Sequence, residues 1–298
     1  MTFLTVALVN TPESPCPYTH NAACMEFLNG FTEYGFRVSE AKTLEDCRDK
    51  TILLFSSHRV DLGYLKSVNT VNSDAIYILW YYHDHLSSIP FKKFILTGEY
   101  FFHTPRTASH LRFDRINKSI ANFVPLMFRA NDSPGTIGSV ELPRIRDGVF
   151  MGTPYKSDWA SGLKNTLYHD ITRSGLLPYE TRKQNYLTSK VAFGFHDPNN
   201  ILNYHVTQRV FEGLAYGCIV LSDNPAATEM TGGIVEYVAD KAEFLQKLAY
   251  FLNNDDACKK KREAGYEWVK KYGTNRYAAL LFLKKTNELF GANYAESE

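Results

Sequence analysis

Apolar residues in the first part of the chain occur in short runs, separated by longer amphipathic stretches. The short runs predict buried β-strands at 3–9, 36–39, 51–56, 75–82, 94–102 and 123–128. The stretches between them carry helical spacing at 20–34, 62–71 and 109–116. Strands that alternate with helices in this way predict a parallel sheet covered by helices.

A polar stretch at 129–143, rich in Asn, Asp, Ser, Pro and Gly, interrupts the alternation and predicts a linker. Beyond it the pattern resumes, with strands expected at 148–152, 190–195, 219–221 and 233–238. Helices are expected at 159–173, 208–216, 241–252, 257–272 and 276–290. The pattern predicts two domains, 1–130 and 144–298, and leaves open whether the last helix packs back on the first domain.

Composition narrows the class of protein. A chain of 298 residues that is 44% hydrophobic and 14% aromatic is suited to two cored domains, not to a disordered or fibrous chain. The formal net charge of +1 gives no general attraction to nucleic acid or to an anionic membrane. The five cysteines are scattered without Cys-x-x-Cys spacing, so the sequence predicts neither a disulfide framework nor a zinc site.

The apolar runs of the chain do not predict a targeting or membrane segment. No run approaches the roughly 20 apolar residues that a membrane span requires. Residues 1–10 lack a basic region before their apolar run, which is typical of a first strand and not of a signal peptide. We therefore expect no transmembrane segment and a cytoplasmic location.

The most informative stretch is 190–224, which reads as strand, polar loop, helix, glycine turn and strand. Thr207 is suited to cap a helix at 208–216, and Gly217 to end it. Arg209, in the first turn beside free backbone N–H groups, would suit a diphosphate. Glu212, one turn later, could accept hydrogen bonds from a ribose diol. Taken singly, Arg209 and Glu212 would more often be surface charges, but their order between two strands favours a nucleotide-sugar pocket.

The segment that runs from Thr207 to Glu212 and from Gly217 to Asn224 resembles the donor-binding core of GT-B glycosyltransferases. It is similar to the α1,3-fucosyltransferase motif, with four replacements, at His205, Gln208, Arg209 and Val220. It also resembles the Arg-x-x-Glu and Gly-Cys pattern of exostosin-like and group 1 transferases, which corresponds to Arg209, Glu212, Gly217 and Cys218. The sequence lies between these two branches.

This resemblance implies a fold and a division of labour. The implied fold is GT-B, an α/β architecture of two doubly wound Rossmann-like domains facing a cleft. The N-terminal domain would bind the acceptor, and the C-terminal domain would bind a UDP- or GDP-linked sugar. Fixed cations and helix N–H groups would stabilise the leaving diphosphate, so we expect no metal and no other cofactor.

Further donor-site candidates follow the expected strands, because ligands of doubly wound sheets bind beyond the carboxyl ends of strands. The loop after 148–152 offers a glycine and a cation, Gly152, Thr153 and Lys156. The remaining candidates come from the basic segment before the next strand and from the loop and helix start after it: Arg182, His196, Asp197, Asn199, His205, Thr207 and Gln208. Asp197-Pro198-Asn199 equally fits a plain turn.

Inverting glycosyl transfer also needs a general base that takes the acceptor proton. Asp84 is our first candidate, since it lies in His83-Asp84-His85 after the strand at 75–82. His20 and Glu13, in or near the loop after the first strand, are the rivals. The His-x-His pair also invites a metal reading, but no third ligand stands at a suitable spacing.

The sequence thus predicts an inverting, metal-independent glycosyltransferase that moves a sugar from a UDP- or GDP-sugar to a hydroxyl of a glycan. The alternative is a nucleotide-sugar-binding protein of the same fold that has lost catalysis. A nicotinamide-dependent oxidoreductase is disfavoured, because Asn10-Thr11-Pro12-Glu13 stands where a Gly-x-Gly-x-x-Gly loop would follow the first strand.

Overall fold

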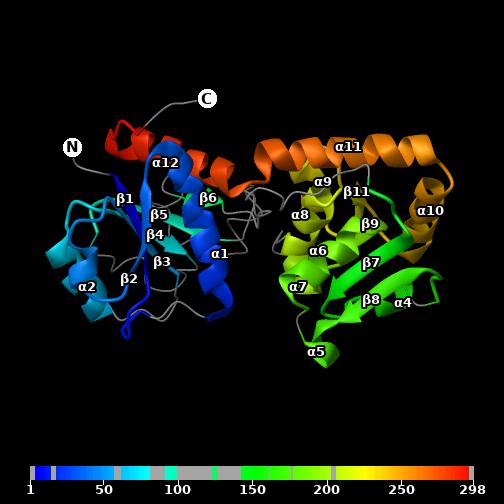
Figure 1. Cartoon of the computed structure of the whole chain (residues 1–298), viewed down its shortest axis with the longest axis horizontal. Helices are drawn as coiled ribbons and strands as arrows, with labels where there is room; N and C mark the ends of the chain where they lie inside the picture. The colour runs from blue at the N-terminus through cyan, green and yellow to red at the C-terminus, as the bar shows by residue number, and fades with distance from the viewer. Residues whose placement is uncertain are drawn as a thin grey trace. The chain divides into compact units, whose positions relative to one another are not determined.

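The computed structural model describes residues 4–14, 18–56, 62–80, 91–98, 123–125, 142–160, 162–175, 177–202 and 206–294. The chain divides into two compact units (Figure 1). Unit 1 comprises Met1–Glu99, His103–Leu126 and Asn275–Glu298, and unit 2 comprises Tyr100–Phe102 and Met127–Thr274. Among the described residues, no helix has both the length and the apolar character that crossing a membrane demands.

Unit 1 is built on a six-stranded parallel sheet in the order β2-β1-β3-β4-β5-β6. Its strands are β1 Thr5–Val9, β2 Arg37–Ala41, β3 Ile52–Phe55, β4 Ile76–Trp80, β5 Phe94–Gly98 and β6 Phe123–Pro125. Its helices are α1 Tyr18–Asn29, η1 Gly30–Tyr34, η2 Glu45–Cys47, α2 Leu62–Val71 and α12 Asn275–Phe290. The chain crosses from β1 to β2 on one side and to β3 on the other, as in a doubly wound sheet.

Side chains of alternate strand residues in unit 1 enter two cores. Val6 and Leu8 of β1 face a core shared with α1 and α12. Ala7 and Val9 of the same strand face a core shared with α2. Both faces of the sheet are therefore buried at its centre, which is why the central strands β1 and β3 are almost entirely apolar, whereas the edge strand β2 is not.

Helix α12 is part of the unit 1 core although it follows unit 2 in the sequence. The ring of Phe282 lies 5.2 Å from that of Phe27 on α1. At the start of α12 the backbone of Asn275 approaches Gly30 so closely that a side chain at Gly30 would clash with it. The C-terminal helix thereby covers one face of the N-terminal sheet.

Unit 2 is built on a five-stranded parallel sheet in the order β11-β10-β9-β7-β8. Its strands are β7 Arg146–Gly152, β8 Thr166–Asp170, β9 Ser189–Gly194, β10 Ile219–Ser222 and β11 Glu236–Tyr237. Its helices are α4 Ser157–Ala160, α5 Ile171–Ser174, α6 Tyr179–Leu187, α7 Pro198–Leu202, α8 Gln208–Ala215, α9 Pro225–Met230, α10 Lys241–Leu252 and α11 Asp255–Tyr272.

Helix α8 lies against one face of the unit 2 sheet, where Val210, Phe211 and Leu214 enter the core. A β-carbon at Gly213 would lie 2.9 Å from side-chain atoms of both Ala192 on β9 and Val220 on β10. Glycine at this position lets the helix approach the two strands closely. The start of α8 is thereby held over the carboxyl ends of β9 and β10.

Most of the elements expected from the sequence are present in the described residues, and one expectation is wrong. The stretch 159–173 is not one helix: it forms the end of α4, then strand β8, then α5. Two turn residues, Gly162 and Asn165, have positive φ angles of 79° and 53° and separate α4 from β8. The helix expected at 109–116 lies outside the described residues, and the strand expected at 233–238 is reduced to Glu236–Tyr237.

Candidate functional site

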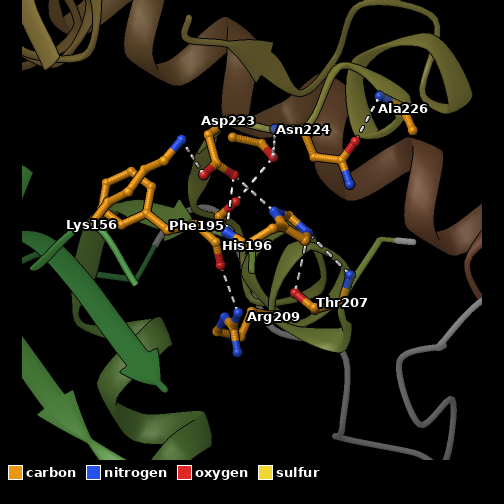
Figure 2. A network of polar contacts seen from close by, with 10 residues as sticks. Lys156, Phe195, His196, Thr207, Arg209, Asp223, Asn224 and Ala226 are labelled. Carbon is orange, nitrogen blue, oxygen red and sulfur yellow. Dashed lines mark hydrogen bonds and ion pairs between the residues drawn. The ribbon is translucent and has the colours of Figure 1, made fainter. Parts of the chain in front are cut away.

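The strand order of unit 2 locates a candidate site. β7 lies between β8 and β9, so the direction of winding reverses between β7 and β9. Doubly wound sheets bind ligands at such a switch point, beyond the carboxyl ends of the strands. The loops that follow β7, β9 and β10 bring Lys156, His196 and Asp223 together there, beside the start of α8 (Figure 2).

Arg209, in the first turn of α8, is a half-buried cation at this switch point. Its Nη2 donates a hydrogen bond to the carbonyl oxygen of Phe195 at 2.7 Å, and its guanidinium lies 5.3 Å from the ring centre of Phe150. Its buried Nε has no hydrogen-bond partner, and within the described part of the chain Arg209 forms no ion pair. Burial lowers the pKa of Arg209, and the nearby charges of Glu212 and Asp223 offset this effect only in part.

The space that Arg209 occupies exists because residue 152 is a glycine. A β-carbon at Gly152, the last residue of β7, would lie 2.5 Å from Nη1 and 2.9 Å from Cζ of Arg209. Glycine at position 152 thus leaves room for the guanidinium at the end of β7. The next residue, Thr153, is half-buried and accepts a backbone hydrogen bond from Tyr155 at 2.8 Å.

Asp223, just after β10, is buried and ionised. Burial raises its pKa, but hydrogen bonding to His196 and the charge of Lys156 outweigh burial and hold the pKa below its usual value. The Lys156 ammonium lies 2.8 Å from Oδ2, as an ion pair outside hydrogen-bond geometry. Lys156 itself has a φ of 53°, a conformation rare for a residue with a side chain, and its ammonium lies 4.5 Å from the ring centre of Trp159. Its charge is therefore partly neutralised before any ligand arrives.

The His196 ring has no exposed surface and joins Asp223 to the start of α8. Asp223 Oδ1 lies 3.0 Å from both the backbone nitrogen and the ring Nδ1 of His196. The backbone N–H of Thr207 donates to His196 Nε2 at 3.2 Å (Figure 2). A contact of this ring with a base or ribose, which the sequence suggested, does not fit a side chain enclosed in this way.

Thr207 is the N-cap residue of α8, but its side chain makes no capping hydrogen bond. Its hydroxyl lies 3.4 Å from His196 Nε2 instead. The helix continues with Gln208, which is half-buried, and Arg209. The first backbone N–H groups of a helix have no acceptor within it, so this end of α8 is suited to an anion.

Glu212 lies one turn further along α8 and is buried. Its Oε1 accepts a hydrogen bond from Nη1 of Arg182 at 3.0 Å, and the two charges form an ion pair. Arg182 projects from α6, an element that the sequence analysis did not anticipate. The structure thus brings Arg182 and Glu212 together.

The loop after His196 begins a short helix. Asp197 accepts the backbone N–H of Asn199 at 2.6 Å, and this bond, with one from the Tyr155 hydroxyl, lowers the pKa of Asp197. Asp197 therefore starts α7, in keeping with the plain-turn interpretation, and Asn199 is exposed. His205 lies outside the described residues.

The three candidate bases of unit 1 are less fully described. Glu13 is exposed, in a tight loop closed by a bridge between Thr11 and Ser14. His20 lies in α1, outside the part of the structure whose side chains are described, and Asp84 lies outside the described residues altogether. Within the residues that are described, no three His, Cys, Asp or Glu side chains are grouped as metal ligands would be.

The sequence analysis did not single out Asp223, or Phe150, whose ring lies against the Arg209 guanidinium. Asp223 stands in the Ser222-Asp223-Asn224 run that was noted only as part of a resemblance. A signal was available, because an acidic residue directly after a buried strand lies at the edge where ligands bind. Phe150 gave no comparable signal, since an aromatic residue inside a strand is ordinary core.

Comparison with known proteins bears on the fold and the class of protein. Residues 139–284 match the sequence family described as glycosyl transferase-like. The crystal structure of a glycosyltransferase from Rickettsia africae is similar, with a TM-score of 0.58 and 13% identity, over 97% of this chain and 99% of that one. A mutant of the O-GlcNAc transferase of Thermobaculum terrenum gives a TM-score of 0.53 at 12% identity, over 96% and 69% of the two chains. No curated protein sequence matches this chain closely enough to add to these findings.

The fold class expected from the sequence is thereby confirmed. The chain has two parallel-sheet, Rossmann-like α/β units, the fold of GT-B glycosyltransferases. Identities of 12–13% establish the fold alone, so they assign no substrate and no branch.

The contact between Gly152 and Arg209 can be tested without a ligand. Gly152→Ala should lower the free energy of unfolding by about 1 kcal/mol, because the new methyl group displaces the guanidinium. In an Arg209→Ala background the same change should cost less, since the clash is gone, and urea unfolding of all four proteins measures the difference. Equal costs in both backgrounds would show that Gly152 does not make room for Arg209.

Proposed function

We propose that this protein is a glycosyltransferase that uses a UDP- or GDP-linked sugar and transfers the sugar, with inversion and without a metal ion, to a hydroxyl of a glycan. Unit 2 binds the donor and unit 1 supplies the acceptor site and the base. The glycosyl transferase-like family of residues 139–284 supports the reaction class. The burial of Arg209, with no partner for its Nε, supports binding of the donor diphosphate at the start of α8.

Arg209 is the observation that carries the proposal. A half-buried guanidinium whose buried Nε has no partner, and which forms no ion pair with a described carboxylate, is costly unless a ligand completes it. An anion bound there would also meet the positive end of α8. A diphosphate matches both features, because its oxygens accept from a guanidinium fork and from backbone N–H groups at once.

Lys156 and the Arg182–Glu212 pair extend the donor site on either side. The ammonium of Lys156 is fixed 2.8 Å from Asp223 Oδ2, and it adds positive charge without having to be ordered on binding. The Glu212 carboxylate, held by Arg182, is one turn along α8 from Arg209 and would receive the ribose hydroxyls. A carboxylate has several acceptor lone pairs, so Glu212 could accept from those hydroxyls as well as from Arg182.

In the proposed reaction the acceptor oxygen attacks the anomeric carbon of the donor. The bond between this carbon and the phosphate oxygen breaks, and the nucleoside diphosphate leaves with the electron pair. The acceptor proton passes to a base of unit 1, for which Asp84 is preferred over His20 and Glu13. Arg209, Lys156 and the start of α8 stabilise the charge that develops on the leaving diphosphate.

Two branches of transferases remain compatible with this site. The order of Arg209 and Glu212 favours the exostosin-like and group 1 pattern, in which an arginine precedes the glutamate by three residues. The ungapped alignment with the α1,3-fucosyltransferase motif favours the other branch. The nucleotide that binds best discriminates between them, since GDP is expected for a fucosyl donor.

We predict that nucleotide binding depends on Arg209. Loss of charge-assisted hydrogen bonds worth about 1.5–3 kcal/mol should weaken UDP or GDP binding by about tenfold or more in Arg209→Ala. Thermal shifts across UDP, GDP, ADP and their sugars identify the ligand, because saturation at about a hundred times Kd adds roughly 2.7 kcal/mol. The matched control is Arg48→Ala, which removes an exposed arginine of unit 1. Unchanged affinity in a folded Arg209→Ala protein would rule out this seat for the diphosphate.

A second prediction concerns metal dependence. Sugar transfer should continue in excess EDTA at a rate within about twofold of the untreated enzyme, since side-chain and helix charge would neutralise the leaving group. Product formation with and without added Mg²⁺ or Mn²⁺ measures this. Activity that disappears on chelation and returns with the metal would contradict the proposal and turn attention to His83-Asp84-His85.

The third prediction concerns the base. Asp84→Asn should lower turnover by about a hundredfold or more and leave nucleotide affinity almost unchanged, because general base catalysis contributes about 10²–10⁴. Glu13→Gln and His20→Ala serve as comparison variants in the same assay. Normal turnover in Asp84→Asn with loss in one of the others would move the role to the first loop.

If all three variants stay active, the inverting mechanism is wrong, and NMR of the product anomer identifies a retaining one. If every folded variant and the native protein bind nucleotide but transfer nothing to a panel of glycans, the protein is a nucleotide-sugar-binding protein.

A further inference from the structure

We propose that His196, held by Asp223, is a positioning residue that fixes the start of α8 and with it Arg209. This inference rests on the proposed function for its consequence in donor binding, but its structural part can be tested separately. It gives His196 a role other than ligand contact.

The hydrogen bonds define which nitrogen of His196 carries the proton. The backbone N–H of Thr207 can only donate, so Nε2, at 3.2 Å, must offer a lone pair. In a neutral ring the proton then resides on Nδ1, which donates to Asp223 Oδ1 at 3.0 Å. The carboxylate thereby selects one tautomer, as an acceptor beside a histidine commonly does.

This tautomer ties the start of α8 to the sheet. His196 Nε2 receives the N–H of Thr207, and the preceding carbonyl, of Phe195, receives Arg209 Nη2 at 2.7 Å. Two successive residues at the exit from β9 thus hold two residues of one helix start. Because the Thr207 side chain makes no capping bond, the imidazole supplies the side-chain acceptor at this end of the helix.

Asp223 extends the same restraint to the loop after β7. One carboxylate oxygen accepts from His196, and the other pairs with Lys156 at 2.8 Å. Lys156 and Arg209, the two cations that we assign to the diphosphate, are therefore positioned through a shared pair of buried residues. A bond lost at His196 would let the Arg209 end of the site move.

Two substitutions of His196 test its two ring nitrogens separately. Glutamine is long enough to place an amide oxygen near the position of Nε2, so His196→Gln keeps an acceptor for Thr207. Asparagine is shorter, so His196→Asn keeps a donor for Asp223 near the position of Nδ1 but offers no acceptor to Thr207. His169→Asn is the matched control, since His169 lies on β8 in the same unit, where its Nε2 is 2.8 Å from the carbonyl oxygen of Gly175.

Three measurements on the full chain test the inference. Ring ¹⁵N spectra should show a protonated Nδ1 and an unprotonated Nε2, with the His196 signals assigned by their loss in His196→Gln. Amide exchange at Thr207 should accelerate about tenfold in His196→Asn and stay near the native rate in His196→Gln and His169→Asn. Calorimetry with UDP and GDP should give a Kd about tenfold weaker for His196→Asn and within about threefold for His196→Gln.

The outcomes separate this inference from the proposed function. A proton on Nε2, or equal Thr207 exchange in His196→Asn and the native protein, would overturn the inference whatever the nucleotide does. The expected tautomer and exchange pattern in a protein that binds neither UDP nor GDP would uphold the positioning of α8 and refute the donor site. Tight binding by a folded His196→Asn protein would refute the coupling between the two.

Discussion

The carboxylate of Asp223 has almost no exposed surface. The arrangement of the loops at the carboxyl ends of the unit 2 strands follows from that burial. A buried charge is tolerated only where hydrogen bonds and an opposite charge replace the lost water. Here the replacement comes from His196 at the end of β9 and Lys156 after β7. Satisfying one carboxylate therefore draws the loops after three strands to one point. The pKa of Asp223 is lowered because the contacts with His196 and Lys156 outweigh the effect of burial.

Arg209 is the complementary case, a cation that forms no ion pair with any described residue. Gly152 provides its space, Phe150 lies beneath it, and one carbonyl fixes its orientation. These contacts hold the guanidinium in place without cancelling its charge. A site preorganised in this way loses little entropy on binding an anion, and it offers its full charge when a leaving group develops. At this site Lys156 is paired with Asp223, whereas the neighbouring Arg209 has no ion-pair partner among the described residues.

The sequence predicted the α/β class and the segment from β9 to β10 because buried parallel strands and glycine-terminated helices leave strong local patterns. Strand β8 was mistaken for helix, since its five half-buried residues at a sheet edge carry a weak pattern and Leu163 and Leu167 have helical spacing. The burial of His196 could not be inferred, because it depends on Asp223, 27 residues later in the chain. The Arg182–Glu212 pair spans 30 residues and two helices, so neither residue indicates the other locally.

The place of α12 has a consequence for the order in which the protein can form during synthesis. Nearly all of unit 2, Met127–Thr274, leaves the ribosome before Asn275, the first residue of α12. Unit 1 begins the chain, yet the core on the Val6 and Leu8 face of its sheet has only the contribution of α1, without that of α12, until Phe282 and Leu283 have been made. Domains usually complete in the order of synthesis, whereas here the second unit can close first. Until then the nascent first unit exposes the apolar residues that α12 later covers, which is the kind of surface that chaperones bind.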